Sequence, residues 1–202
     1  MIEMLKIAGH VKKHYKPVCL LFEDFKNRNG QNATLEEFMK FVESYAADIQ
    51  NEDERMTFKG DMLEILAELF FKAFANSPTV GLTDYTPVPI TEDFGVDGQG
   101  KNATGKHCAV QSKYRSNPLD LVTYAEIART YTSGRVQLGL SLEGDDCIFV
   151  FTTALGVNIQ CQTVFKGMVR VIGREIIARE INNNVSFWNM AFEEIRVTLL
   201  GD

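Results

Sequence analysis

The run that most constrains the fold is CIFVFTT at residues 147–153, which is apolar and rich in aromatic and β-branched residues. Such a run is typical of a strand buried on both faces of its sheet. A sheet of this kind needs cover on each side. The run therefore favours a layered α/β architecture.

The strongest predicted helix spans residues 57–76. It is apolar nearly all round, and its polar residues Asp61, Glu64, Glu68 and Lys72 recur at i, i+3, i+7 and i+11, which leaves one narrow polar stripe. Thr34 and Glu37 form a capping box that opens a second helix. This second helix is predicted at 34–49, and other helices at 1–14, 119–133, 157–165, 174–181 and 187–195.

Strands are predicted on both sides of a polar turn. VDGQGK at 96–101 and KHCAVQSKY at 106–114 flank the turn NATG. Residues 79–90 indicate an irregular edge strand, and 168–173 a further strand. The order of helix, hairpin, helix, strand, helix, strand, helix predicts an α/β sandwich with a central mixed sheet.

Two polar segments divide the N-terminal part of the chain. NRNGQN at 27–32 is predicted to be a loop, and NEDER at 51–55 an exposed connection. We place a domain boundary at the second of these segments, with an N-terminal helical extension at 1–55 and the main domain at 56–202.

The composition is that of an ordinary globular chain, with 202 residues of which 45% are hydrophobic and 24% charged. No apolar run approaches the roughly 20 residues of a membrane span, and the N-terminus lacks the apolar core of a signal peptide. The four cysteines show no CxxC spacing and are interpreted as reduced thiols. We therefore expect an intracellular, cytoplasmic protein without membrane contact.

The net charge of −6 argues against a nucleic-acid partner, but the charge is unevenly distributed. Residues 101–135 contain six basic residues against two acids, a local charge of +4, and residues 23–68 contain five against twelve, a local charge of −7. One segment could face a polyanion, although two solvated faces of opposite sign explain the same numbers.

The predicted hairpin brings three polar residues together. With the turn near residues 103–104, Asp97 lies across from Val110 or Gln111. Gln111 and Lys113 are two apart on one strand and so point to the same face. Polar groups on a central strand are costly unless they serve each other or a ligand.

Phosphodiester hydrolysis is the chemistry that such a group suits. The Asp97 carboxylate, the Gln111 amide oxygen and the Ser112 carbonyl are hard oxygen ligands for Mg²⁺, which would polarise the phosphate and acidify an attacking water. Lys113 could orient that water and offset charge on the transition state. A helix acid would complete the ligand set, and Glu64 is the candidate.

Asp93-Phe-Gly-Val-Asp97-Gly followed by Ala109-Val-Gln-Ser-Lys113 resembles the D-x-G-x-D and V-Q-x-K motifs of Mrr-like restriction endonucleases, a branch of the PD-(D/E)xK superfamily. LEILAELF resembles the first helix of that group, and FVFTTALGV and VRVIGREI its third and fourth strands. KGDMLEILAELF and NNNVSFW further resemble nuclease domains of viral or phage helicases. The resemblance covers residues 57–181 and not 1–52.

This resemblance implies a restriction-endonuclease-like three-layer sandwich and a DNA endonuclease that uses Mg²⁺, with Mn²⁺ as a substitute. Asp97, Gln111 and Lys113 would form its centre, Glu64 would be the helix acid and Asp93 would brace Asp97. It also implies DNA as a partner, a homodimer, or a helicase or ATPase module. Candidate DNA-backbone contacts are Lys101, Lys106, Arg115, Arg129 and Arg135.

Several alternatives stay open at this point. Asp97-Gly98 could be a simple turn, and Lys113 a solvated strand end. Glu68 competes with Glu64 as the helix acid. Because Gln111 replaces the usual acid and removes one negative charge from the metal shell, a nuclease fold that binds nucleic acid without cutting is the main rival.

Two further features have plain explanations. His10 and His14 have zinc-ligand spacing but no third ligand nearby, and His107 could contact phosphate or simply be exposed. Trp188 is interpreted as core packing rather than a base-stacking platform.

Overall fold

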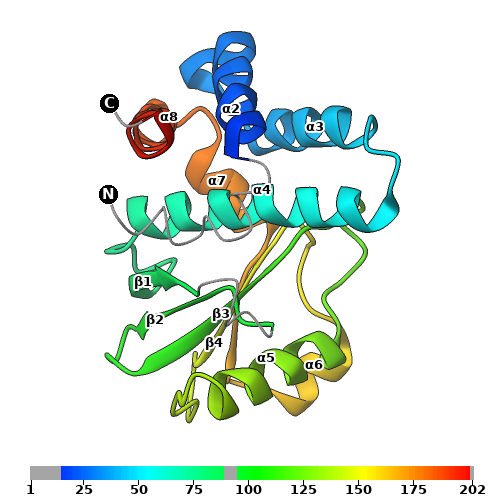
Figure 1. The fold of residues 1–202 in the computed structure, drawn as a ribbon. Coiled ribbons are helices and arrows are strands. Elements are labelled where there is room, and N and C mark those ends of the chain that lie inside the picture. Colours follow the sequence, from blue (N-terminus) through cyan, green and yellow to red (C-terminus); the bar gives the residue numbers. More distant parts are fainter. Residues whose placement is uncertain (1–14, 89–94, 201–202) are drawn as a thin grey trace.

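The computed structural model describes residues 15–88 and 95–200. Within these residues, helices cover both faces of one mixed five-stranded sheet, so the predicted α/β class is confirmed (Figure 1). The strands are β1 (Leu82–Pro87), β2 (Gly98–Asn102), β3 (His107–Lys113), β4 (Ile148–Thr152) and β5 (Val169–Ile172). The helices are α2 (Tyr15–Asn29), α3 (Leu35–Ala46), α4 (Glu52–Ala73), α5 (Tyr124–Val136), α6 (Ile159–Val164), α7 (Arg174–Ile181) and α8 (Val185–Leu200), with a 3₁₀ turn, η1, at Gly30–Asn32.

The sheet has the strand order β1-β2-β3-β4-β5. Strands β1, β2 and β3 are antiparallel, whereas β3, β4 and β5 are parallel. Every residue of β4 is buried, as predicted for the run at 147–153. The predicted hairpin is β2 and β3, in which Gly98 pairs with Val110.

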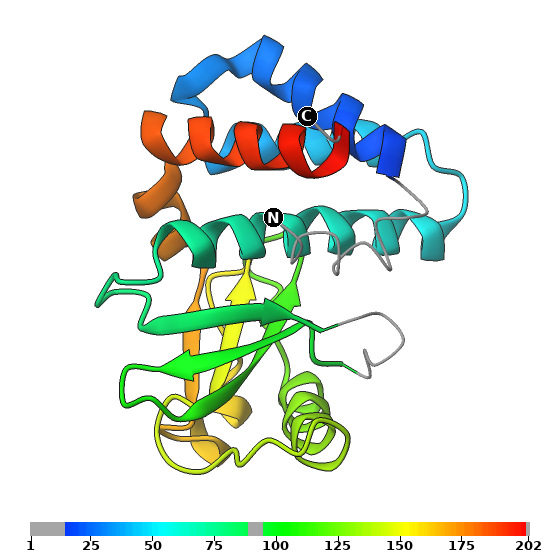
Figure 2. The same cartoon turned by 60° about the vertical axis from the view of Figure 1, so that its left-hand side comes forward.

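The two faces of the sheet carry separate apolar clusters. Val110, Phe149 and Phe151 belong to the cluster beneath α4, whereas Ala109, Ile148 and Val150 belong to the cluster beneath α5 and α6. Helices α2, α3 and α8 lie on the far side of α4 (Figure 2). Helix α4 is therefore enclosed between the sheet and other helices, which explains why it is apolar nearly all round.

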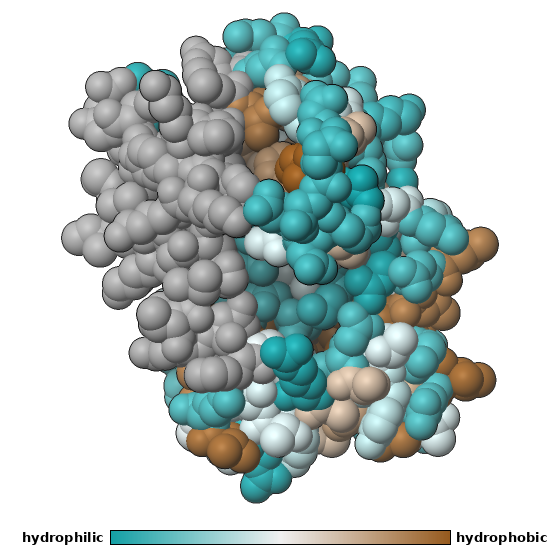
Figure 3. Space-filling view, turned by 45° about the vertical axis from the view of Figure 1, so that its right-hand side comes forward, coloured by the Kyte–Doolittle hydropathy of each residue, from teal (hydrophilic) through white to brown (hydrophobic). Residues whose placement is uncertain are grey.

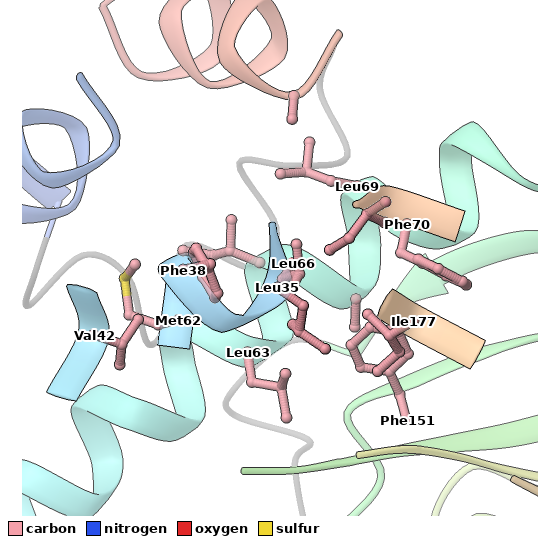
Figure 4. Packing of buried hydrophobic residues seen from close by; sticks show 14 of the residues in the cluster. Leu35, Phe38, Val42, Met62, Leu63, Leu66, Leu69, Phe70, Phe151 and Ile177 are labelled. Atoms are coloured by element: carbon pink, nitrogen blue, oxygen red, sulfur yellow. The ribbon is translucent and has the colours of Figure 1, made fainter. Parts of the chain in front are cut away.

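The N-terminal helices share this core. Leu35, Phe38 and Val42 of α3 lie against Met62 and Leu66 of α4 (Figure 4). Trp188 of α8 is fully buried, and its indole N–H donates to the carbonyls of Ala33 (2.7 Å) and Ile181 (2.9 Å). The prediction that Trp188 is a core residue is confirmed.

Two N-terminal predictions are wrong. Residues 51–54 are exposed and Arg55 is half-buried, but the segment is not a connection, because the Asn51 side chain caps α4 and accepts from the Glu54 N–H. The 55/56 boundary therefore falls within the helix. Residues 27–29 are helical rather than a loop, because α2 packs against α8 and the Asn29 side chain donates to the Phe25 carbonyl. The predicted helix at 1–14 lies outside the described residues.

The remaining elements agree more closely with those predicted from the sequence. The capping box of Thr34 and Glu37 is present. The helix predicted at 119–133 starts later, at Tyr124, because Val122 forms a parallel bridge with Val157 and Thr123 caps the helix. No helix in the described part of the chain is long and apolar enough to cross a membrane.

Candidate active site

The hairpin places Asp97 and Gln111 in direct contact. Asp97 immediately precedes β2, and its N–H donates to the Val110 carbonyl. The Gln111 Nε2 donates to Asp97 Oδ2 at 2.6 Å, and the Ser112 N–H donates to the same oxygen at 2.5 Å. Asp97 is 7% exposed and Gln111 3%. The predicted hairpin juxtaposition is confirmed, and Asp97-Gly98 is not a simple turn.

The amide of Gln111 is oriented differently from the expectation that its oxygen would lie beside Asp97. Its nitrogen faces Asp97 and also lies 3.3 Å from the Ser112 carbonyl, while its oxygen accepts from the Thr130 hydroxyl at 2.8 Å. The physical reason is that the Asp97 carboxylate and the Ser112 carbonyl are both acceptors, so only the amide nitrogen can satisfy them.

Thr130 is a site residue that the sequence did not reveal. It lies on α5, is fully buried, and also contacts the Glu126 carbonyl at 3.1 Å. The available signal was a polar residue on the buried stripe of this helix, where Thr130 and Ser133 follow Ile127 at helical spacing.

Lys113 ends β3 on the same face as Gln111 and is partly exposed. Its backbone is fixed by Thr152 of β4, whose hydroxyl donates to the Lys113 carbonyl at 2.7 Å. Among the described residues, its ammonium has no hydrogen-bond or ion-pair partner. The backbone of Lys113 is therefore held in place, while its ammonium can interact with a ligand.

Tyr85 of β1 is close enough to two acids of α4 and to Asp97 to be affected by their charges. Burial raises the pKa of Tyr85 well above its usual value, and the charges of Glu68, Asp97 and Glu64 raise it further. The phenol therefore stays protonated. Glu68 is 5% exposed and Glu64 is partly buried, so the choice between them as helix acid stays a prediction.

Tyr85 is the second residue that the sequence did not reveal. A β-bulge between Thr83 and Thr86, with φ of 53° at Asp84, interrupts β1. The Tyr85 ring stacks on Phe71 at 5.1 Å and lies over Gly98, where an added Cβ would come within 2.4 Å of ring atom Cε2. Gly98 is thus required by a close approach of the tyrosine.

This close approach gives a stability prediction. Gly98→Ala is expected to destabilise the protein by about 1–3 kcal/mol, because the methyl group overlaps the Tyr85 ring. In a double-mutant cycle by urea unfolding, Tyr85→Ala should recover much of that loss. Gly60→Ala is the control, because nothing lies near its Cβ position and alanine favours the helix. Additive losses for Gly98 and Tyr85 would show that the contact is wrong.

Among the described residues, the candidate oxygen ligands for a metal ion do not belong to a cluster of acidic side chains. Within residues 15–88 and 95–200, no group of three or more His, Cys, Asp or Glu side chains is placed to hold a metal ion. Asp93, the expected brace of Asp97, lies outside the described residues, as do His10 and His14. His107 is exposed at the start of β3.

The basic residues expected to contact a DNA backbone differ in their exposure and in their ion pairing. Arg115 is 2.7 Å from Glu126 and 3.2 Å from Asp120, so its guanidinium is engaged internally. Lys101 pairs with Asp84 at 2.9 Å. Lys106 and Arg129 are exposed, and Arg129 lies against Gly95.

Arg135 is also exposed and donates to the Tyr131 hydroxyl at 2.7 Å. Of the five expected DNA contacts, Lys106, Arg129 and Arg135 are thus the exposed ones.

Two cavities lie away from these residues. One of about 450 Å³ is bounded by β5, α6 and the start of α7, next to the exposed Leu155. The other, of about 360 Å³, lies between α3 and Arg174. Neither is lined by Asp97, Gln111 or Lys113. In the coloured part of Figure 3 hydrophilic residues predominate, and several hydrophobic residues lie at its right-hand edge.

A polar network joins the N-terminal layer to the end of β3. Glu43 of α3 accepts from Lys59 (2.6 Å), Tyr114 (2.9 Å) and Ser116 (2.6 Å). Partial burial would raise the pKa of Glu43, but these three donors lower it overall. The residue that follows Lys113 is thereby tied to α3 and α4.

Comparison of the chain with protein-family models, with curated proteins and with solved structures finds no match.

Proposed function

We propose that the chain is a metal-dependent nuclease of the PD-(D/E)xK type, in the Mrr-like branch, that hydrolyses DNA phosphodiester bonds endonucleolytically. The observation that carries the proposal is the buried Asp97–Gln111 contact, with Lys113 on the same face of β3 as Gln111. The strand order and the helices on both faces are compatible with a restriction-endonuclease-like sandwich.

The chemistry of the residues fits a hard divalent cation. The Asp97 carboxylate, the Gln111 amide oxygen and the Ser112 carbonyl are oxygen donors, with Glu64 or Glu68 as the helix acid. The Ser112 hydroxyl is also buried and has no partner among the described residues, which is costly unless a ligand supplies one. Bound Mg²⁺ or Mn²⁺ supplies Lewis acidity at the phosphate.

The protein residues then have distinct tasks. Lys113 donates a hydrogen bond to a non-bridging phosphate oxygen and offsets the negative charge that develops there. A water oxygen loses a proton to solvent and forms a bond to phosphorus, the ester P–O bond breaks, and the released alkoxide takes up a proton from solvent. Tyr85 stays protonated and can donate to an anionic ligand. Lys106, Arg129 and Arg135 position the DNA backbone.

A second candidate function is a nuclease fold that binds nucleic acid without cutting. The observation that favours it is the Gln111 nitrogen on Asp97, which already satisfies the carboxylate without a cation. A helicase or restriction module as partner, and a homodimer, are further proposals from the motif resemblance.

The function is tested by incubating the purified protein with supercoiled plasmid, linear duplex, single-stranded DNA and RNA, with EDTA, Mg²⁺ or Mn²⁺. The proposal predicts cleavage of DNA that depends on the cation. DNA binding without cleavage under all these conditions would favour the binding-only alternative.

A further inference from the structure

The Thr130 hydroxyl can either donate a hydrogen bond to the Gln111 amide oxygen or accept one from the amide nitrogen. Its oxygen lies 2.8 Å from Gln111 Oε1 and 3.1 Å from the Glu126 carbonyl. A hydroxyl has one proton to donate and can also accept. When the proton points to Gln111, the amide oxygen is satisfied. When it points to Glu126, the hydroxyl oxygen can accept from the amide nitrogen instead.

The groups that face the Gln111 amide determine which of its two orientations is favoured. Asp97 Oδ2 and the Ser112 carbonyl both face the amide, at 2.6 and 3.3 Å, and both are acceptors. Without a cation, turning the amide oxygen toward them would place three oxygens together in a buried site, which is unfavourable. With a divalent cation at Asp97, the amide oxygen becomes the favoured group, since a hard cation takes oxygen ligands.

We propose that Thr130 is the positioning residue of this centre, and that the Gln111 amide turns over when a divalent cation binds at Asp97. The Thr130 hydroxyl turns at the same time, from Gln111 Oε1 to the Glu126 carbonyl, and accepts from Gln111 Nε2. Neither state then leaves a buried amide group without a partner. This inference rests on the proposed function, because it requires cation binding at Asp97.

The first test is nuclear magnetic resonance of the side-chain amide of Gln111, whose signals are identified as the pair missing from Gln111→Met. On titration with Mg²⁺ we expect this pair to shift and to gain a nuclear Overhauser effect to the Thr130 methyl group. A cation that binds while the amide signals keep their metal-free contacts would overturn the inference alone.

The second test is calorimetric titration of Mg²⁺ and Mn²⁺ into Thr130→Val and Thr130→Ser. Valine removes the hydroxyl and leaves an amide N–H unpaired in the bound state, which proteins tolerate less well than an unpaired carbonyl. We expect the Kd to rise several-fold to tenfold in the valine variant and to change less than twofold in the serine variant. A lower Kd for valine would overturn the inference.

The wild-type titration separates failure of the inference from failure of the proposed function. If the wild-type protein shows no saturable binding of either cation, the proposed function and the inference both fail. If it binds and the valine variant binds equally well, only the role of Thr130 fails. The serine variant and the wild-type spectra keep the test decisive even where the valine variant folds poorly.

Discussion

The Lys113→Met variant is expected to bind Mg²⁺ as the wild type does, but to cut DNA about 10²- to 10³-fold more slowly. The Lys113 ammonium has no partner among the described residues, so its removal leaves no internal group unpaired. The backbone at this position is held by Thr152. The loss should therefore appear in the cleavage rate rather than in folding.

Single-turnover cleavage of a labelled duplex measures this loss, with calorimetry to verify cation binding. Lys166→Met is the matched control, because Lys166 is exposed between α6 and β5 and lines only the cavity there. Unchanged cutting by Lys113→Met would mean that Lys113 is a solvated strand end.

The Gln111→Glu variant is expected to be less stable than the wild type without metal, by about 3 kcal/mol or more. The 2.6 Å contact would then join two buried carboxylates, which cannot both stay ionised at that distance unless a cation lies between them. We expect Mg²⁺ or Mn²⁺ to restore the lost stability and to bind about tenfold more tightly than to the wild type, equivalent to about 1.4 kcal/mol.

Urea unfolding in EDTA and in excess cation measures both effects. Gln111→Met is the matched control, because it removes the same hydrogen bonds without adding a charge. It should lose stability in EDTA and regain less with the cation than Gln111→Glu. A glutamate variant as stable as the wild type in EDTA would show that residue 111 does not contact an ionised Asp97.

The Asp97–Gln111 contact could be predicted because it depends on local rules. Alternation along a strand and the length of the turn fix the register of a hairpin, and a register error would move Gln111 to the other face. The same applies to β4, whose unbroken apolar run required cover on both faces. These features are encoded by neighbouring residues.

The other parts of the site depend on contacts between distant segments. Thr130 meets Gln111 only because α5 packs over β3, and nothing in the α5 sequence specifies that partner. Tyr85 lies over Gly98 because of the bulge at Asp84 and the absence of a side chain at Gly98. The orientation of the Gln111 amide follows from acceptors that only the assembled site presents.

The N-terminal errors have a similar cause. The charged residues at 51–55 favour a connection by composition, yet acids in the first turn stabilise a helix N-terminus and Asn51 supplies the cap. Helix α2 gains its stability from burial of Phe22 and Phe25 in the core, which composition alone does not reveal.

The central claim is tested most directly by plasmid cleavage with Mg²⁺, comparing the wild type with Asp97→Asn. The asparagine oxygen can still accept from Gln111 and Ser112, so the substitution removes the charge and not those hydrogen bonds. Asp48→Asn, at an exposed position in the turn after α3, is the control. The proposed function predicts that the wild type and the control cut DNA and that Asp97→Asn does not. Equal cutting by all three proteins would contradict it.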